Sequence, residues 1–211
     1  MNNQHAVVVG AGAGGLTMAL LLAAAGRRVT LLEITPRIGG YLQRFRREGV
    51  PFDTGFHFTG GFENVLAQML RVLRIDDVVH EEAFGSRIFF GDTGRGLTLP
   101  GGGWQAVADY LSEEYPEQRE RIQAYYRCER EVIEHTPMFD LHDRDVAGKL
   151  MLNEYDFLTL DDYLDKLGIT GELRAVLSSA AMCHGTPPCE TSVTHHCRVS
   201  YGLGNHIARV R

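Results

Sequence analysis

The sequence has no hydrophobic run long enough to cross a membrane. Its longest uncharged apolar stretch, residues 16–25, is about half of what a transmembrane helix needs. The opening residues, MNNQHAVVV, also lack the basic region and the cleavage site of a secretory signal peptide. The sequence therefore predicts a soluble, cytoplasmic protein.

The sequence is also poor in cysteine and has no excess of positive charge. Its four cysteines are irregularly spaced, which does not suit a disulfide framework, so we expect free thiols. A net charge of −6 argues against nucleic-acid binding. One exception is residues 27–47, which hold six arginines and a single acid, Glu33. This patch suits either phosphate binding or an ordinary solvated surface, and the sequence leaves both open.

Ligands with the spacing of a metal site are absent as well. The segment CHGTPPCETSVTHHC, residues 183–197, collects three cysteines and three histidines but contains no short C-x-x-C pair. His195 and His196 are sequential, so on a helix they would point about 100° apart. We therefore expect no metal here, and instead a turn followed by the start of a helix.

The first third of the chain contains a strand, a helix and a second strand. Apolar, β-branched runs at residues 6–9 and 29–32 predict buried parallel strands. Residues 15–25 are strongly helix-forming and apolar on nearly every side, and Gly26 stands where a C-cap glycine belongs. We expect this helix to be buried against a sheet. The fold class is therefore α/β, with a Rossmann-like βαβ unit.

The rest of the chain predicts a mixed α+β, largely helical region. Its character changes only near residue 80, so we expect one region at 1–80 and a second at 81–211. Helical spacing of apolar residues predicts the helices, and turn residues between short apolar runs predict a hairpin. The expected helices span residues 62–75, 104–115, 116–135, 159–168 and 171–183, and the hairpin joins residues 86–90 to 97–99.

The loop after the first strand matches the dinucleotide-binding pattern G-x-G-x-x-G. Gly10 permits a tight turn, Gly12 lets the backbone approach a pyrophosphate, and Gly15 lets the helix pack close to the strand. The helix N-terminus would offer its free N–H groups to the phosphates. Glu33 ends the second strand, at the distance needed to bind the adenosine ribose. The residues predicted to bind the dinucleotide here are Gly10, Ala11, Gly12, Gly14, Gly15 and Glu33.

More glycines follow this acid. Gly39 and Gly40 form a pair six residues after it, and the phrase FDTG occupies residues 52–55. The succession of glycine loop, glutamate, GG pair and F-D-x-G resembles the N-terminal signature of a family of FAD-dependent oxidoreductases. That family includes carotenoid desaturases, carotenoid isomerases and retinol saturase, and FDTGFHF is most similar to the last branch. The resemblance extends weakly to HGTPP and so spans nearly the whole chain.

The resemblance implies an enzyme that uses FAD for hydride transfer. The implied substrate is long, apolar and conjugated or isoprenoid, and it would be desaturated, saturated or isomerised. Thr35 and Tyr41 stand where the family often has basic residues, whereas Arg37 is kept. The resemblance adds Arg37, Gly39, Gly40, Asp53 and Gly55 to the cofactor-binding residues, and it assigns Phe56, His57 and Phe58 to a substrate channel.

The resemblance also carries expectations about partners. Members of the family are much longer, so the chain is expected to be the N-terminal portion of such an enzyme, completed by a C-terminal half. The resemblance then implies an FAD or dinucleotide-binding region at 1–80 and a partial substrate or lid region at 81–211. An apolar substrate resides in lipid, which implies peripheral contact with a membrane surface.

Asp53 and His57 would share one face of an extended strand, with Phe52, Phe56 and Phe58 forming an apolar wall on the other. Over four extended residues the Cα atoms of Asp53 and His57 would lie about 13 Å apart, so we expect no contact between the two side chains. A turn-forming aspartate and a buried histidine are favoured over an acid–base pair. No catalytic residue is assigned.

Two other functions stay open at this point. Glu33 suits NAD as well as FAD, so the chain could be an NAD(P)-dependent dehydrogenase, which only the GG pair and the FDTG phrase oppose. By resemblance, the family's C-terminal part supplies a second, glycine-rich flavin contact. A chain that has the adenosine end of the site but lacks this contact could also be a catalytically silent nucleotide-binding fragment.

Overall fold

The computed structural model describes residues 5–57, 59, 65–75, 78, 80–82, 85–91, 93–137, 139–149, 152–204 and 207–210. The chain forms two compact units, here called the first and the second unit. The first comprises residues 1–59 and 69–79, and the second comprises residues 60–68 and 80–211. Helix α2 (Val65–Val72) contributes to both. The functional roles expected for residues 1–80 and 81–211 stay a prediction.

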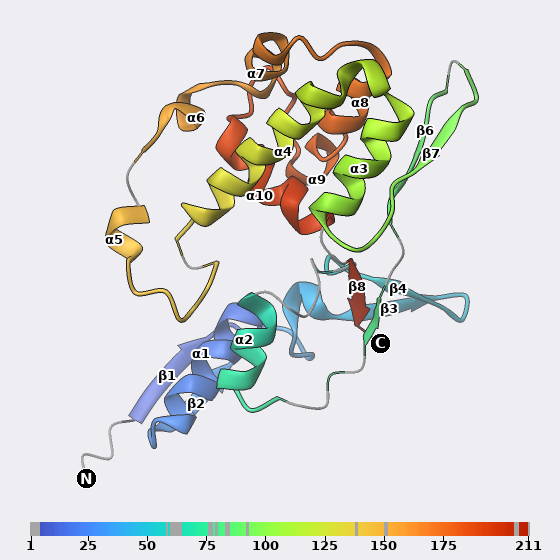
Figure 1. Ribbon diagram of the computed structural model, residues 1–211. Helices are drawn as coiled ribbons and strands as arrows, with labels where there is room; N and C mark the ends of the chain where they lie inside the picture. The colour runs from blue at the N-terminus through green and yellow to red at the C-terminus, as the bar shows by residue number, and fades with distance from the viewer. Residues whose placement is uncertain are drawn as a thin grey trace. The chain divides into compact units, whose positions relative to one another are not determined.

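The first unit contains a βαβ crossover (Figure 1). β1 (His5–Val9) and β2 (Arg28–Leu32) pair in parallel over their full length, and α1 (Ala13–Ala24) packs against both strands. These bounds agree with the strands and the helix expected from the apolar runs. The predicted Rossmann-like unit is confirmed.

The expected burial of α1 is wrong. None of its residues is buried, and Met18 and Leu20 are 51% and 44% exposed. In the described part of the first unit, the sheet that α1 covers has two strands. A helix that is apolar on nearly every side needs neighbours on several sides, and two strands supply only one of them.

A hairpin that the sequence did not predict follows the βαβ unit. The 3₁₀ turn η1 (Gly40–Leu42) leads into β3 (Arg44–Arg47), which pairs antiparallel with β4 (Val50–Asp53). Phe45 and Phe52 stack across the two strands, with ring centroids 5.5 Å apart. Arginines on β3 and a proline in β4 obscure the apolar alternation by which strands are recognised.

The second unit is largely helical, as predicted. α4 packs against α3 and α10, and α7 contacts both α4 and α10. Trp104 starts α3 and Thr159 caps α7, as the sequence indicated. The helices are α3 (Trp104–Glu114), the 3₁₀ turn η2 (Pro116–Gln118), α4 (Arg119–Glu134), α5 (Val146–Lys149), α6 (Glu154–Phe157), α7 (Leu160–Leu167), α8 (Gly171–Ser178), α9 (Ala181–His184) and α10 (Val193–Gly204).

Two small antiparallel sheets complete the second unit. β6 (Arg87–Phe89) and β7 (Gly96–Thr98) form the predicted hairpin. β5 (His80–Glu82) pairs with β8 (Ala208–Val210). This pairing brings together the beginning and the end of the segment 80–211. The mixed α+β, largely helical region expected from the sequence is therefore confirmed.

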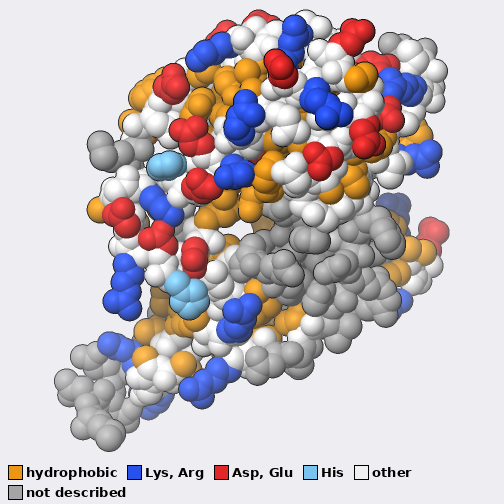
Figure 2. All heavy atoms as spheres, in the orientation of Figure 1, with side chains coloured by type: hydrophobic (Ala, Val, Ile, Leu, Met, Phe, Trp, Pro, Cys, Tyr) orange, Lys and Arg blue, Asp and Glu red, His pale blue; other side chains and the backbone are white. Residues whose placement is uncertain are grey.

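The core of the second unit lies where the apolar faces of its helices meet. α4 is charged along one side and buried along the other, as its sequence indicated. Charged side chains of both signs are interspersed over the visible surface of these helices (Figure 2). The largest fully buried side chains include Leu111, Ile122, Tyr125, Leu160, Leu164, Ile169, Leu173 and Val193.

The single helix expected at residues 171–183 is wrong, because it is two helices. α8 ends at Ser178, and α9 begins at Ala181. The amides of Ser179, Met182 and Cys183 each bond to the carbonyl three residues earlier, so the α-helical ladder tightens to 3₁₀ bonding at this point. Apolar spacing alone does not report such a change.

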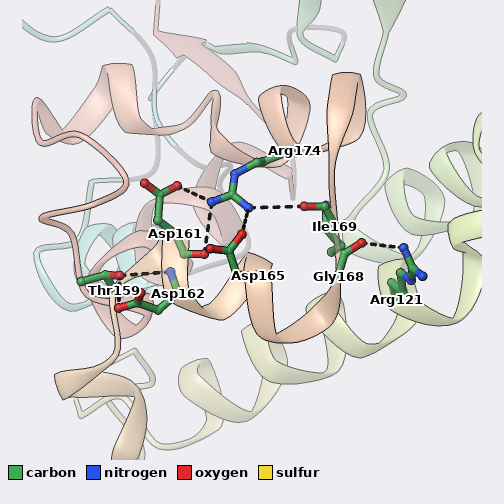
Figure 3. Close-up of polar contacts among 8 residues, drawn as sticks. All are labelled: Arg121, Thr159, Asp161, Asp162, Asp165, Gly168, Ile169 and Arg174. Atoms are coloured by element: carbon green, nitrogen blue, oxygen red, sulfur yellow. Dashed lines mark hydrogen bonds and ion pairs between the residues drawn. The ribbon is translucent and has the colours of Figure 1, made fainter.

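Side-chain polar contacts fix α7 at its start and against α8 (Figure 3). The Thr159 hydroxyl accepts a hydrogen bond from the Asp162 amide at 3.1 Å and donates one to the Asp162 carboxylate at 2.7 Å. From α8, the Arg174 guanidinium binds Asp161 at 2.8 Å and Asp165 at 2.6 Å. These charge-assisted bonds set the packing of α8 on α7.

Among the described residues, none of the helices has both the length and the apolar character that a membrane crossing requires.

Candidate functional site

The glycine loop joins β1 to α1, and each of its glycines has a different environment. Gly10 has φ of +93°, which other residues rarely adopt, and its amide donates to the Leu32 carbonyl at 2.7 Å. A Cβ on Gly15 would lie 1.8 Å from the Gly10 carbonyl oxygen, so α1 approaches the loop only because Gly15 has no side chain. These two glycines are required by the fold itself.

Gly12 is not explained in this way. Its φ of −78° is open to any residue, and an added Cβ would meet nothing within 4 Å. Its missing side chain leaves the backbone open at the start of α1. The same open space surrounds Gly14. A dinucleotide pyrophosphate that approaches the backbone at this point accounts for that space.

The start of α1 has the electrostatics of an anion site. Gly12 is its N-cap residue and supplies no side-chain cap, and the first turn contains no acid. The first N–H groups of a helix have no partner within the helix, and the helix dipole places positive charge there. The residues present therefore fit a bound phosphate group.

Glu33 lies against the same loop. Its carboxylate accepts hydrogen bonds from the Ala11 amide at 2.7 Å and from the amide and hydroxyl of Thr35, each at 2.9 Å. The Thr35 amide and then the Ala11 amide lower the pKa of Glu33, because they stabilise its ionised form. An ionised carboxylate accepts hydrogen bonds, which is the role that a ribose hydroxyl requires of its partner.

The GG pair also reaches the glycine loop. The Gly39 amide donates to the Ala11 carbonyl at 2.6 Å, and Gly39 has φ of +117°. A Cβ on Gly40 would lie 3.1 Å from the Gly12 Cα, so the pair and the loop are in close contact. Two motifs that are separate in the sequence therefore meet in the first unit.

The FDTG phrase is joined to the pair through Tyr41. The Phe56 amide donates to the Tyr41 carbonyl at 3.2 Å, and the Thr54 amide donates to the Gln43 carbonyl at 3.1 Å. A Cβ on Gly55 would lie 2.8 Å from the Tyr41 ring. The glycine loop, the GG pair and the FDTG phrase thus form one continuous set of contacts.

The remaining predicted residues lie around this set. Arg37 is exposed, and its backbone carbonyl accepts a hydrogen bond from the Gln43 side chain at 3.0 Å. The Thr35 hydroxyl lies 2.7 Å from the same carbonyl, which competes with Glu33 for its one hydrogen. Phe56 is half-buried, whereas His57 is exposed, so the expected burial of His57 is wrong. Phe58 lies outside the described residues.

The expected separation of Asp53 from His57 is wrong. His57 Nδ1 lies 3.9 Å from one oxygen of Asp53, and the side chain of Arg44 binds the other oxygen at 2.7 Å. β4 ends at Asp53 and the chain bends at Thr54 and Gly55, so the extended geometry behind the expectation does not apply.

Sequence reasoning missed the residues that hold these motifs in place. Thr35, Tyr41, Gln43 and Arg44 supply their contacts mostly through backbone groups or through partners on a neighbouring strand. Thr35, two residues after Glu33, is the one that a local signal could have revealed, since threonine hydroxyls commonly bond to nearby groups.

The segment at residues 183–197 adopts the turn and helix start that its sequence indicated. Its cysteines are free thiols, with Cys183 and Cys189 exposed and Cys197 buried in α10. Among the residues that the structure describes, no group of three or more metal-ligating side chains is gathered.

Comparisons with known proteins agree with this geometry. A model of NAD(P)-binding Rossmann-like domains matches residues 8–73. The all-trans-retinol 13,14-reductase of Macaca fascicularis is 30% identical over 90% of this chain, which spans 34% of that protein. The 4,4'-diapolycopene oxygenase of a Methylomonas species is 44% identical over 26% of this chain and 11% of its own length.

A solved structure shows the same fold. A triple variant of putrescine oxidase superposes on 99% of this chain and 46% of its own with a TM-score of 0.66, at 15% identity. The chain thus spans about a third of the length of the retinol reductases and under half of this structure. The chain is therefore a homologue of the all-trans-retinol 13,14-reductases, and the resemblance to the oxidoreductase family with retinol-saturating and carotenoid-modifying members is confirmed.

Proposed function

We propose that the chain corresponds to the N-terminal part of an FAD-dependent oxidoreductase that moves hydride to or from a long, apolar, conjugated or isoprenoid substrate. The observation that carries the proposal is the open backbone at Gly12, in contact with the GG pair at Gly40. Glycines such as Gly91 have open space as well, so the weight rests on where Gly12 stands, at the N-terminus of α1 and against Gly40.

The residues present fit the cofactor. The N–H groups of the loop and of the first turn of α1 would hold the pyrophosphate, and Glu33 would hold the ribose. Arg37 is exposed and lies between Glu33 and the GG pair in the sequence. Its guanidinium would add positive charge near the phosphates. When bound, the flavin supplies the hydride chemistry, and the protein positions it and keeps water away.

FAD is favoured over NAD by the second and third motifs. A Rossmann-like unit and an acid after β2 serve either dinucleotide. Here Gly39 bonds to the glycine loop and Gly55 packs against Tyr41, so the GG pair and the FDTG phrase are joined to the loop by contacts, as a shared FAD site would require. An NAD(P)-dependent dehydrogenase remains the second candidate.

The substrate class rests on the relatives. One relative carries all-trans-retinol in its name and another carries diapolycopene, and both names describe apolar compounds. Phe56 and His57 remain the residues proposed for the substrate channel in this chain, together with Phe58. Peripheral contact with a membrane, as the source of such a substrate, remains part of the proposal.

The exposed apolar side chains of the first unit support a further partner, the C-terminal half. Val9 is 82% exposed, Ile34 is fully exposed and Tyr41 is 78% exposed. Apolar surface of this kind is usually covered in the functional protein. We infer that the sequence found only in the longer relatives corresponds to the part that covers it. Without that part, the chain would be the catalytically silent fragment that is the third candidate.

The absorption spectrum of the purified protein tests the proposal. We expect the visible bands of bound flavin, or a melting temperature that rises with added FAD and not with NAD. A colourless protein that responds only to NAD would favour the dehydrogenase, and one that responds to neither would favour the silent fragment.

Gly12→Ala and Gly91→Ala form a matched pair of variants. An added Cβ meets nothing within 4 Å at either position, so both proteins should fold with nearly unchanged stability. Gly12→Ala should weaken FAD binding at least tenfold, about 1.4 kcal/mol, because the methyl group occupies the space assigned to the pyrophosphate. Equal FAD affinity in the two variants would contradict the assignment.

A further inference from the structure

The turn that follows β2 holds the Glu33 carboxylate largely through one residue, Thr35. One carboxylate oxygen of Glu33 accepts from the Thr35 amide and lies 2.9 Å from the Thr35 hydroxyl. The other oxygen accepts from the Ala11 amide. The sequence favours this arrangement, because Pro36 restricts the backbone of the residue before it to extended conformations. Thr35 therefore loses little backbone freedom when it binds Glu33.

The Thr35 hydroxyl carries one hydrogen and lies between two acceptors. The Arg37 carbonyl is 2.7 Å away and the Glu33 oxygen is 2.9 Å away. An ionised acceptor binds a hydrogen more strongly than a neutral one, and the Arg37 carbonyl also accepts from the Gln43 side chain at 3.0 Å. The hydrogen therefore goes to Glu33 while Glu33 is ionised, and it is free to turn to the Arg37 carbonyl once Glu33 is protonated.

The two ends of this turn are tied to the same residue of the glycine loop. Ala11 is fully buried, its amide donates to Glu33 at 2.7 Å, and its carbonyl accepts from the Gly39 amide at 2.6 Å. The segment 33–39 thus begins and ends against the loop at the start of α1. Because Ala11 holds one carboxylate oxygen of Glu33 and Thr35 holds the other, the plane of the carboxylate is fixed.

Among the described residues, hydrogen bonds rather than ion pairs hold Glu33. The segments bonded to it are the glycine loop, which has no titratable side chain, and residues 34–39, whose one charged side chain, Arg37, is exposed. The Thr35 amide, then the Ala11 amide and then the Thr35 hydroxyl lower the pKa of Glu33, and burial raises it by less. The hydroxyl therefore acts on the charge of Glu33 as well as on its orientation.

We propose that Thr35 is a positioning residue of the dinucleotide site, whose hydroxyl fixes the Glu33 carboxylate to accept hydrogen bonds from the adenosine ribose. The proposal rests on the proposed function, which assigns the ribose to Glu33. Ribose hydroxyls that donate need an ionised carboxylate, because a protonated carboxyl group presents a hydrogen of its own. Thr35 thereby extends to lower pH the range over which the site binds its dinucleotide.

Nuclear magnetic resonance of the ligand-free protein tests whether the hydroxyl holds the carboxylate. The carboxyl carbon signal that disappears in Glu33→Gln should titrate below the ordinary range of glutamate. Thr35→Val removes the hydroxyl but keeps the amide and the branched shape, so it should raise the pKa of Glu33, and Thr35→Ser should restore it. Thr30→Val removes a hydroxyl that is bonded to His5 and should change nothing. Equal pKa values in the parent and in Thr35→Val would overturn the proposal.

FAD binding measured against pH tests whether this contact serves the ligand. Thr35→Val should weaken binding about fivefold at neutral pH, the loss expected for one hydrogen bond. As the pH is lowered, this variant should lose FAD at a higher pH than the parent does. Thr35→Ser should restore both the affinity and the pH profile, and Thr30→Val should match the parent. A weaker affinity with an unshifted pH profile, or no recovery in Thr35→Ser, would overturn the proposal.

The two experiments separate this proposal from the proposed function. A parent protein that shows the lowered titration of Glu33 but binds no FAD at any pH would contradict the proposed function. FAD binding by the parent, with the titration of Glu33 unchanged in Thr35→Val, would overturn the role of Thr35 and leave the proposed function standing.

Discussion

The two units differ in how much of their apolar surface they bury. In the second unit the described helices enclose a core with many fully buried side chains. Among the described residues of the first unit, Ala11 alone is both apolar and buried. Most large apolar side chains that remain exposed also belong to the first unit. The second unit therefore has the core of a compact domain, whereas the first leaves most of its large apolar side chains at its surface.

Substitutions of two matched leucines, one in each unit, test this comparison. Leu164 is fully buried in the second unit, and Leu20 on α1 is 44% exposed. Leu164→Ala should cost about 3 kcal/mol of unfolding free energy, because it leaves a cavity in a packed core, and Leu20→Ala should cost less than about 1 kcal/mol. Urea unfolding followed by circular dichroism would measure both. Similar losses would show that the two units are equally packed.

The pH dependence of stability should come from the second unit. Burial raises the pKa of Glu129 on α4 to about 7 in the folded protein, against 4.5 when exposed. The folded state therefore keeps a proton that the unfolded state loses, so the contribution of Glu129 to stability is greatest below pH 4.5 and is lost as the pH rises through about 7. The loss is about 3 kcal/mol. Thermal melts should show that Glu129→Gln removes this loss and that Glu120→Gln, which changes an exposed acid on the same helix, retains it.

Low pH should destabilise the second unit, because His196 becomes protonated. Burial lowers its pKa to about 4 from 6.5, so its contribution is present above pH 6.5 and is lost as the pH falls through about 4. His196→Gln should make the acid side of the stability profile shallower. A profile that stays as steep in this variant as in the parent would show that His196 is not buried and neutral.

A smaller effect is expected from the cap of α7. Thr159→Ala removes the side-chain acceptor for the Asp162 amide and should cost about 1 kcal/mol of unfolding free energy. Thr159→Ser keeps that acceptor and should cost only a few tenths of that amount. Equal losses in the two variants would show that the contribution of Thr159 is packing by its methyl group.

The sequence predicted the parts that depend on local patterns. Apolar runs and glycines located the βαβ unit, and the threonine before residues 160–167 located the start of α7. Pairing between segments far apart in the chain, such as β5 with β8, leaves no local pattern and was not predicted. The exposure of α1 could not be predicted from local sequence either, because it depends on how many strands the sheet beside it has.

The candidate site was predicted as motifs but not as an arrangement. The spacing of Gly10, Gly12, Gly15 and Glu33 is enough to indicate a dinucleotide loop. The contact of Gly40 with that loop depends on turns whose positive φ values could not be placed from the sequence alone. The approach of His57 to Asp53 depends on a bend after β4.

Hydrogen exchange with and without FAD tests the central claim most directly, namely that the glycine loop and the GG pair form one dinucleotide site in the first unit. FAD should slow exchange at the amides of residues 10–16 and 39–42 and leave the core amides of α4 and α10 unchanged. NAD should slow it much less. Protection by FAD confined to the second unit, or equal protection by NAD, would contradict the account.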